Sequence, residues 1–406
     1  MDQREAGQRI ARARRSRGLS QAVLAELVGR SESWLSQVER GKRGIDSHAV
    51  LTLMAQVLHV EIEELTGPQR QETTSRRPYP IARQIERAMT SYTALDDAIS
   101  SPIAQNPCDT RSLEHRISLA HQRYQAARYE EAGRLMPALI EDTDTATRAA
   151  STDSSDLWRI RARVYDLTAA LLNRVGEHPL AWGAADRAIS ASEQSGQPLM
   201  IALAAYRMTY VLTSRGHPRE AVGLATAAAA AIARTMKCRS PQPEQISLCG
   251  GLHLAAANAA AADYESAQSA SLLRAAQLIA ERLGHDANLM GTAFGPTNVA
   301  IHTMSASARL CEWATVISIG ESLDAAAMPA GLIGRRTQIK LDLARAYAAR
   351  RQDAAAVNTL LAAEQLSPQL VQFNKSTRDV ITTLLHREHR ASTPQLRPLA
   401  HRSGLI

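Results

Sequence analysis

Residues 30–44 read RSESWLSQVERGKRG and carry the strongest structural signal in the chain. About one helical hairpin upstream, residues 18–21 read GLSQ. Gly18 readily adopts the positive φ that ends a helix, and Ser20 is a favourable N-cap for the next helix. Ser31 is a second such N-cap. Together these segments predict two short helices joined by a tight turn.

Apolar residues on both sides of this turn recur at the spacing of amphipathic helices. They form four stripes: Ala6, Ile10 and Ala13; Leu24, Leu27 and Val28; Leu35 and Val38; and Val50, Leu51, Met54, Val57 and Leu58. A terminal turn over 61–65 completes the set. The pattern predicts five short helices packed around a small core.

Over roughly the first 66 residues, this combination of GLSQ, LSQVERGKR and a capped apolar helix resembles the Xre or lambda-repressor-like family of bacterial regulators. The resemblance implies a helix-turn-helix domain over 1–66. Its recognition helix, Ser31 to Glu39, would lie in the major groove of DNA.

The resemblance also assigns roles to individual residues. The positions that face the bases in the family are matched here by Glu32, Ser33 and Gln37. Their chemistry suits the task, because Gln pairs with adenine through two hydrogen bonds and Glu accepts from N4 of cytosine. The positions that grip DNA phosphates are matched by Gln21, Arg40, Lys42 and Arg43.

Two further matches concern the core of this domain. Arg14 and Glu39 match an ion pair that ties helix 1 to helix 3 in the family, so we expect a structural role for both. Trp34 stands where a small residue is typical. We expect it to pack at the edge of the core, with contact to a thymine methyl or sugar as the alternative.

The net charge of +7 is concentrated in the same region. Residues 1–45 hold ten Arg or Lys against five Asp or Glu, whereas the remaining 361 residues hold 37 against 35. A positive surface attracts nucleic acid, so the charge distribution agrees with DNA binding at the front of the chain.

At 406 residues the chain is long enough for a second domain. Residues 67–80 are polar and rich in proline, and read as a linker. Residues 81–388 are predicted to form a helical sensor and dimerisation domain, and residues 389–406 a basic, flexible tail. The four cysteines show no CxxC spacing, and no signal peptide or membrane-spanning run is evident, so we expect a cytoplasmic protein without membrane contact.

A unit of two helices recurs within this second domain, with an alanine early in the second helix. These alanines are Ala132, Ala181, Ala221, Ala267, Ala314 and Ala356, which are 49, 40, 46, 47 and 42 residues apart. A small residue there allows two helices to approach closely. The units resemble degenerate tetratricopeptide repeats. We therefore expect an all-α protein in which a five-helix lambda-repressor-like domain precedes an α-solenoid of tetratricopeptide-like helical hairpins.

One segment of the predicted solenoid, residues 291–302, stands out from the rest. Pro296 is suited to open a helix, and Asn298 and His302 would then project from one face, next to Phe294. This predicts either a ligand contact patch of Phe294, Asn298 and His302, or a helix entry with an aromatic plug and two ordinary polar residues.

Other polar residues at expected inner-helix positions are candidates for the same pocket: Tyr206, Tyr210, Asn258, Arg336 and Lys340, and more weakly Asn173, Arg207 and His253. His302 lacks a paired ligand at metal-binding spacing, so we expect neither a metal nor another cofactor. The sequence holds no GxxxxGK, GxSxG or HExxH motif, and we expect no enzyme activity.

Three functions remain compatible with the sequence. The first is a sequence-specific transcriptional regulator that binds a double-stranded DNA operator as a homodimer, because paired half-sites multiply specificity, and that senses a small molecule or signalling peptide. The second is an antitoxin-like, DNA-bound regulator whose helical groove docks a partner protein. The third is a helical scaffold in which DNA binding is vestigial. The recognition-helix chemistry argues against the third.

Overall fold

The computed structural model describes residues 3–45, 48–58, 60, 65, 79–91, 109–149, 154–237, 240–389 and 391–406. The chain divides into two compact units, Met1–Arg76 and Arg77–Ile406. Both are helical, and the described residues contain no strand. None of the helices found there is both long and apolar enough to cross a membrane.

The first unit contains four described helices: α1 (Gln3–Ser16), α2 (Gln21–Leu27), α3 (Glu32–Glu39) and α4 (His48–Leu58). The predicted caps are confirmed. The hydroxyl of Ser20 accepts from the backbone N–H of Val23 at 3.1 Å, and that of Ser31 accepts from the N–H of Trp34 at 3.2 Å. Gly18 has the expected positive φ of 67°.

A single apolar core holds these helices together, and it includes Ile10, Leu24, Leu35 and Met54, all fully buried. Most of the fifth turn expected over 61–65 lies outside the described residues. Leu65 is described, and it is helical and packed in this core.

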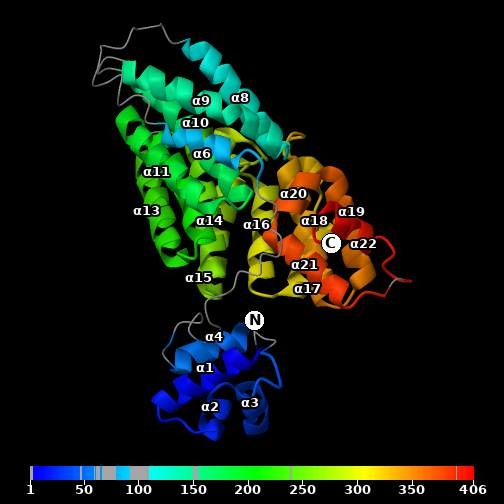
Figure 1. The fold of residues 1–406 in the computed structure, drawn as a ribbon. Helices are drawn as coiled ribbons and strands as arrows, with labels where there is room; N and C mark the ends of the chain where they lie inside the picture. The colour runs from blue at the N-terminus through cyan, green and yellow to red at the C-terminus, as the bar shows by residue number, and fades with distance from the viewer. Residues whose placement is uncertain are drawn as a thin grey trace. The chain divides into compact units, whose positions relative to one another are not determined.

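The second unit is built from six antiparallel helix pairs, visible in Figure 1 as a continuous stack. The pairs are α8 (Thr110–Gln125) with α9 (Tyr129–Ala149), α10 (Ser155–Arg174) with α11 (His178–Ser195), α12 (Pro198–Ser214) with α13 (Pro218–Lys237), α14 (Pro243–Ala262) with α15 (Ser266–Leu283), α16 (Pro296–Arg309) with α17 (Trp313–Ser322), and α18 (Ile333–Ala349) with α19 (Asp353–Leu366). The remaining elements are α6 (Ala82–Thr90), α20 (Pro368–Phe373), α21 (Lys375–His386), α22 (Leu396–Arg402) and the short 3-10 helices η1 (Leu289–Gly291) and η2 (Ala325–Ala327).

The same turn joins the two helices in all six pairs. The second residue before each second helix has a positive φ: Ala127, Gly176, Gly216, Tyr264, Cys311 and Arg351. The next residue donates its N–H to a carbonyl five positions back, for example Glu177 to Leu172 at 2.8 Å and Gln352 to Tyr347 at 2.9 Å. This is the Schellman motif, which satisfies carbonyls at a helix end and reverses the chain.

The small-residue repeat is confirmed in four of the six pairs and wrong in two. The fourth residue of each second helix is buried, and it is Ala132, Ala181, Ala221, Ser269, Val316 and Ala356. Ala267 and Ala314 are exposed instead. The sequence pattern missed the register there because each of those helices begins two residues later than its alanine suggested.

The first helices of the six pairs together form a closed ring. They are α8, α10, α12, α14, α16 and α18. Each packs against the first helix of the next pair, and α18 also packs against α8. Polar contacts strengthen this closure. The side chain of Gln369 accepts from the N–H of Glu130 at 3.1 Å, and the Ser367 hydroxyl donates to the carbonyl of Ala127 at 3.5 Å. Helices therefore surround the interior of the ring around its whole circumference.

Both ends of this unit differ from the sequence-based boundaries. Tyr79, inside the predicted linker, is buried in the core and donates to the carbonyl of Tyr129 at 2.5 Å. The tail expected to be flexible contains α22, whose Leu396 and Leu399 are fully buried in the same core. Arg378 reaches the carbonyl of Ser403 at 2.7 Å, which fixes the chain end. Sequence analysis missed Tyr79, Leu396 and Leu399 as core residues because the segments around them are polar and basic.

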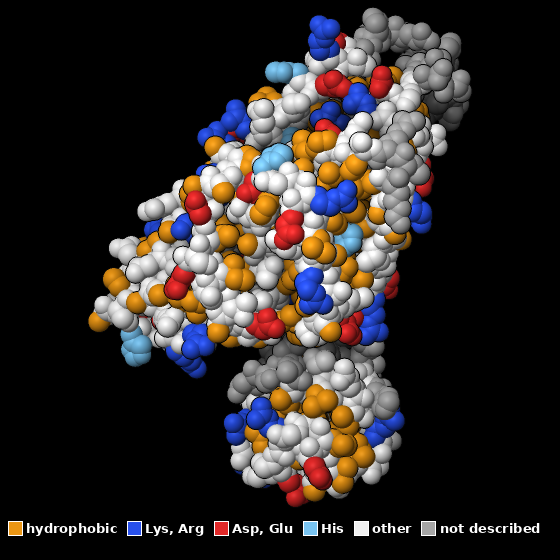
Figure 2. All heavy atoms as spheres, turned by 180° about the vertical axis from the view of Figure 1, so that it is seen from behind, with side chains coloured by type: hydrophobic (Ala, Val, Ile, Leu, Met, Phe, Trp, Pro, Cys, Tyr) orange, Lys and Arg blue, Asp and Glu red, His pale blue; other side chains and the backbone are white. Residues whose placement is uncertain are grey.

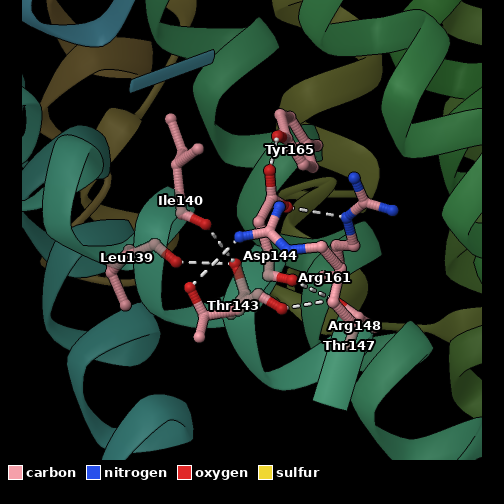
Figure 3. A network of polar contacts seen from close by, with 9 residues as sticks. Leu139, Ile140, Thr143, Asp144, Thr147, Arg148, Arg161 and Tyr165 are labelled. Atoms are coloured by element: carbon pink, nitrogen blue, oxygen red, sulfur yellow. Dashed lines mark hydrogen bonds and ion pairs between the residues drawn. The ribbon is translucent and has the colours of Figure 1, made fainter. Parts of the chain in front are cut away.

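A partly buried polar network joins α9 to α10 (Figure 3). Asp144 accepts from Nε of Arg161 and from the hydroxyl of Tyr165, each at 2.8 Å. The guanidinium of Arg161 also lies 5.4 Å from the ring centres of Trp158 and Tyr165. Arg161 thereby combines a salt bridge to α9 with contacts to two aromatic rings on its own helix, α10.

Candidate functional site

A cavity of about 400 Å³ lies inside the ring of the second unit. All six first helices contribute to its wall, together with the end of α20 and the start of α21. Side chains that line it from these helices include Tyr124, Arg174, Tyr206, Arg207, Tyr210, Asn258, His302, Arg309, Arg335, Asp342 and Arg345. Its volume lies within the range of small-molecule binding sites.

The wall of this cavity is strongly basic. It carries six cationic side chains, Arg174, Arg207, Arg309, Arg335, Arg345 and Lys375, and one carboxylate, Asp342. Only Arg207 forms an ion pair within the described part of the chain, with Asp166 at 3.0 Å. By contrast, basic and acidic side chains are interspersed on the outer face of this unit in Figure 2. The cavity wall therefore carries a larger excess of positive charge than the face shown in Figure 2.

The positive charge of the wall alters the pKa of Tyr124, which lines the cavity from α8. Burial raises the pKa of Tyr124, but the charges of Arg174, Arg207 and Arg335 outweigh it and the net pKa is lowered. A negative charge is therefore favoured within this part of the cavity even though the surroundings are desolvated.

A second feature of the wall is a buried contact among α14, α16 and α18. His302 is 4% exposed and Asn258 is 8% exposed. The amide nitrogen of Asn258 contacts Nδ1 of His302, and Nε2 of His302 lies 3.4 Å from Nη1 of Arg335. Burial, with Arg335 and Arg174, lowers the pKa of His302 well below its ordinary value, so the ring is neutral.

Two tyrosines on α12 supply the aromatic part of the wall. The rings of Tyr206 and Tyr210 meet edge to face, with their centres 5.1 Å apart. The hydroxyl of Tyr210 is buried and makes no hydrogen bond of good geometry to the residues that the structure describes. A buried hydroxyl without a partner is costly, so this atom is available for a ligand.

A second cavity, of about 440 Å³, lies beside the first and shares Gly291 with it. The pair of Arg207 and Asp166 separates them, because Arg207 lines the first and Asp166 the second. Burial lowers the pKa of His121, in the wall of the second cavity, to about 4.

The predicted ligand residues fall into three groups. Tyr206, Tyr210, Asn258 and His302 line the first cavity, as do the weaker candidates Asn173 and Arg207. Phe294 and Asn298 are buried elsewhere. Arg336, Lys340 and His253 do not line either cavity; Arg336 donates to the carbonyl of Met328 at 2.9 Å, and His253 contacts the carbonyl of Cys249 at 2.8 Å.

Phe294 is an aromatic plug, as one of the two sequence hypotheses held. Its ring lies 2.0 Å from the place where a Cβ on Gly250 would stand, so only glycine at 250 admits it. Asn298 lies behind the wall, where its amide nitrogen is 3.5 Å from the carbonyl of Thr292. Of the predicted three-residue patch, only His302 lines the cavity.

Sequence reasoning missed the basic wall because the helix phase was wrong by one residue on α18. Cavity residues there are Arg335, Gln338, Leu341, Asp342 and Arg345, which share one helical face. The available signal was the spacing of Arg335 and Arg345, which recur after nearly three helical turns. No group of three His, Cys, Asp or Glu able to hold a metal occurs among the residues that the structure describes.

In the first unit, α3 presents the residues that sequence analysis assigned to DNA bases. Glu32 and Ser33 are exposed and Gln37 is partly exposed, whereas Leu35 and Val38 face the core. Trp34 is partly buried against that core, and the guanidinium of Arg30 lies 5.6 Å from its ring centre. α3 therefore has one apolar face that packs in the core and one polar face that is open to solvent.

The loop after α3 carries the predicted phosphate-binding cations. Arg40, Lys42 and Arg43 are all exposed. Gly41 has a φ of 67°, and the N–H of Lys42 donates to the carbonyl of Gln37 at 2.9 Å, which fixes the loop against the helix end. The remaining candidate, Gln21, donates to Glu39 at 2.6 Å and is thus tied to the ion pair between α1 and α3.

Comparison with known proteins identifies the type of domain in the first unit. Residues 5–66 match a protein family described as a helix-turn-helix domain. The chain begins with a helix-turn-helix domain. A search of curated proteins gives no match for the chain.

Among solved structures, the chain is similar to PlcR of Bacillus thuringiensis in complex with the peptide PapR7 and DNA. The alignment has 11% identity and a TM-score of 0.31, and it covers 95% of this chain and 98% of that chain. The helices α1 to α4 lie within the residues matched by the helix-turn-helix family, apart from the first two residues of α1.

Proposed function

We propose that this chain is a sequence-specific transcriptional regulator that binds its operator as a homodimer and responds to a small molecule or short peptide held in the ring cavity. One observation carries this proposal. The same chain contains a helix-turn-helix domain and a helical ring with a polar, basic cavity. We assign it no catalytic activity.

DNA recognition is divided between two sets of residues in this proposal. Glu32, Ser33 and Gln37 on the polar face of α3 read base edges. Arg40, Lys42 and Arg43 neutralise phosphates and fix the register of the helix. Gln21 can add a phosphate contact from the start of α2 while its other N–H holds Glu39.

The homodimer follows from the size of the recognition element. One short helix reads only a few base pairs, and two half-sites related by symmetry multiply the specificity. A ligand can change the affinity for the operator only by the ratio of its own affinities for two arrangements of the dimer. We propose that the second unit, as the larger apolar core, carries the dimer contact.

The cavity favours a small ligand over a docked protein. A stable protein interface buries about 800 Å² on each partner, and it needs an open surface. The ring instead closes through α18 against α8 and leaves an interior of about 400 Å³. The antitoxin-like alternative is therefore the weaker proposal.

The test begins with selection of an operator from random duplexes by the full chain. Binding of the selected duplex and a scrambled one is then measured by fluorescence anisotropy. Gln37→Ala should lose about 1–3 kcal/mol on the operator and relax the preference at one base pair. Equal affinity of the unmutated chain for both duplexes would overturn the proposal.

The phosphate contacts have a separate signature. Replacement of Arg40, Lys42 or Arg43 by Ala should weaken every duplex alike and reduce the slope of log K against log salt by about one. Arg219→Ala, which removes an equal charge from an exposed site on the second unit, is the matched control. Light scattering on the full chain should give a dimer.

A further inference from the structure

The contact between Asn258 and His302 fixes the position of the histidine proton. The amide nitrogen of Asn258 donates to the carbonyl of Leu254 at 3.2 Å and also contacts Nδ1 of His302. The reverse amide orientation would set the amide oxygen of Asn258 against the Leu254 carbonyl oxygen, which is repulsive. Nδ1 therefore accepts, and the proton of the neutral ring is on Nε2.

This tautomer leaves two donors facing each other. Nε2–H of His302 lies 3.4 Å from Nη1 of Arg335, and a guanidinium has no acceptor. No carboxylate forms an ion pair with Arg335 in the described parts of the chain. A donor pair inside a protein is satisfied by an acceptor that both can reach, and an anionic oxygen is the strongest such acceptor.

The surroundings of this pair favour an anion with an aromatic body. Arg174 also acts on His302 from the end of α10, which adds positive charge to the same part of the wall. Tyr206 and Tyr210 line the cavity from α12, and the buried Tyr210 hydroxyl makes no hydrogen bond of good geometry to the described residues. A flat apolar group packs well against such rings.

We propose that the ligand of the ring cavity is a small aromatic anion whose carboxylate or phosphate oxygen lies between Nε2–H of His302 and the guanidinium of Arg335. This deepens the proposed function, on which it rests for the idea that the bound molecule acts as an effector. The site uses one buried neutral donor and one cation, so it recognises the anionic group by both charge and hydrogen bonding.

Three probes of matched shape test this proposal by calorimetry on the full chain: benzoate, phenyl phosphate and neutral benzamide. At probe concentrations up to about 10 mM, a Kd of about 1 mM gives near saturation. We expect at least one anion to bind, and benzamide to bind at least about tenfold more weakly. Comparison of benzoate with phenyl phosphate shows whether the site prefers a carboxylate or a phosphate.

Variants locate the binding site. Arg335→Gln should weaken the anion about tenfold or more, Arg335→Lys should retain part of the affinity, and Arg219→Gln, outside the cavity, should change nothing. Equal binding of benzamide and benzoate overturns the inference, as does absence of binding by both anions. If Arg335→Gln fails to fold, two results still test the inference. They are the difference in binding between charged and neutral probes, and the affinity of Arg335→Lys for the anion.

Operator affinity separates this inference from the proposed function. If an anion binds the unmutated chain and Arg335→Gln abolishes binding, the inference stands, whether or not operator affinity changes. If operator affinity changes with benzamide but neither anion binds, the ligand-responsive regulator stands and the inference fails. If anions bind but no ligand of any charge changes operator affinity, the sensing part of the proposed function fails alone.

Discussion

Arg14 of α1 and Glu39 of α3 form a buried ion pair with two parallel hydrogen bonds, Nε to Oε1 at 2.6 Å and Nη2 to Oε2 at 3.0 Å. The third guanidinium nitrogen donates to the carbonyl of Leu19 at 2.8 Å, and Gln21 donates to the same carboxylate. Hydrogen bonding by Glu39 raises the pKa of Arg14. The ion pair at the end of α3 thereby ties this helix to α1, to the turn at Leu19 and to the start of α2.

Removal of one partner of this pair should be strongly destabilising. Arg14→Ala leaves the carboxylate of Glu39 buried without its cation, and we expect a loss of about 3–5 kcal/mol in the stability of the helix-turn-helix domain. Urea unfolding of residues 1–76, in which Trp34 is the one tryptophan, measures this loss by fluorescence. The double variant with Glu39→Ala should lose less than the two single changes together. Strict additivity would show that the pair is not coupled.

A close approach of α1 to α3 makes a second position in this domain critical. A Cβ on Gly7 would stand 2.2 Å from the carbonyl oxygen of Val38 and 2.8 Å from that of Glu39. Gly7→Ala should therefore force the helices apart at a cost of about 3 kcal/mol and weaken operator binding. Gly223→Ala on α13 is the control, because nothing lies within 4 Å of its Cβ, and it should stabilise by about 0.5–1 kcal/mol. An unchanged melting temperature for Gly7→Ala would contradict the close approach.

The helix-turn-helix domain was predictable from sequence because its signals are local. N-caps such as Ser20 and Ser31 and a left-handed Gly18 define helix ends within a few residues. The pairing of Arg14 with Glu39 was predicted as well, from the resemblance to the family. Gly7 gave no such signal, since a contact between the backbones of two helices leaves no pattern in the apolar spacing.

The ring was harder to predict because its function depends on helix phase and on closure. A shift of one residue on a helix turns a side chain by about 100°, and this separates Arg336, which was expected in the pocket, from Arg335, which lines it. Closure of α18 against α8 joins segments about two hundred residues apart, and no local pattern reports such a contact. Tyr124 and Arg174 were therefore missed.

The repeated turn of the second unit provides a test of backbone strain. Arg351 is exposed and has a φ of 63°, whereas Gly216 occupies the equivalent place with a φ of 84°. Arg351→Gly should stabilise the unit by about 0.5–1 kcal/mol, and Gly216→Ala should destabilise it by about 1 kcal/mol. Arg350→Gly is the control, since Arg350 has a negative φ and gains nothing from glycine. Thermal unfolding of the full chain compares the stabilities of these three variants. An equal gain in stability from Arg350→Gly and Arg351→Gly would contradict the backbone strain at Arg351.

Buried histidines should make the second unit sensitive to mild acid. Burial is the largest cause of the lowered pKa of His121; Arg207 and Arg163 act in the same direction, and Asp166 opposes them. In the unfolded chain a histidine takes up a proton near pH 6.5, but in the folded chain His121 does so only near pH 4. The unfolded state therefore binds more protons between these values, and stability falls as the pH falls through this window.

At about pH 5 the expected loss from His121 is about 2 kcal/mol relative to neutral pH. His302, whose pKa is also lowered, acts in the same direction. The urea midpoint of the full chain at neutral pH and at about pH 5 measures the total. His121→Gln should remove its share of the pH dependence, whereas His217→Gln, at an exposed position, should leave the loss unchanged. An identical pH dependence in His121→Gln and the unmutated chain would show that His121 takes up its proton equally in both states.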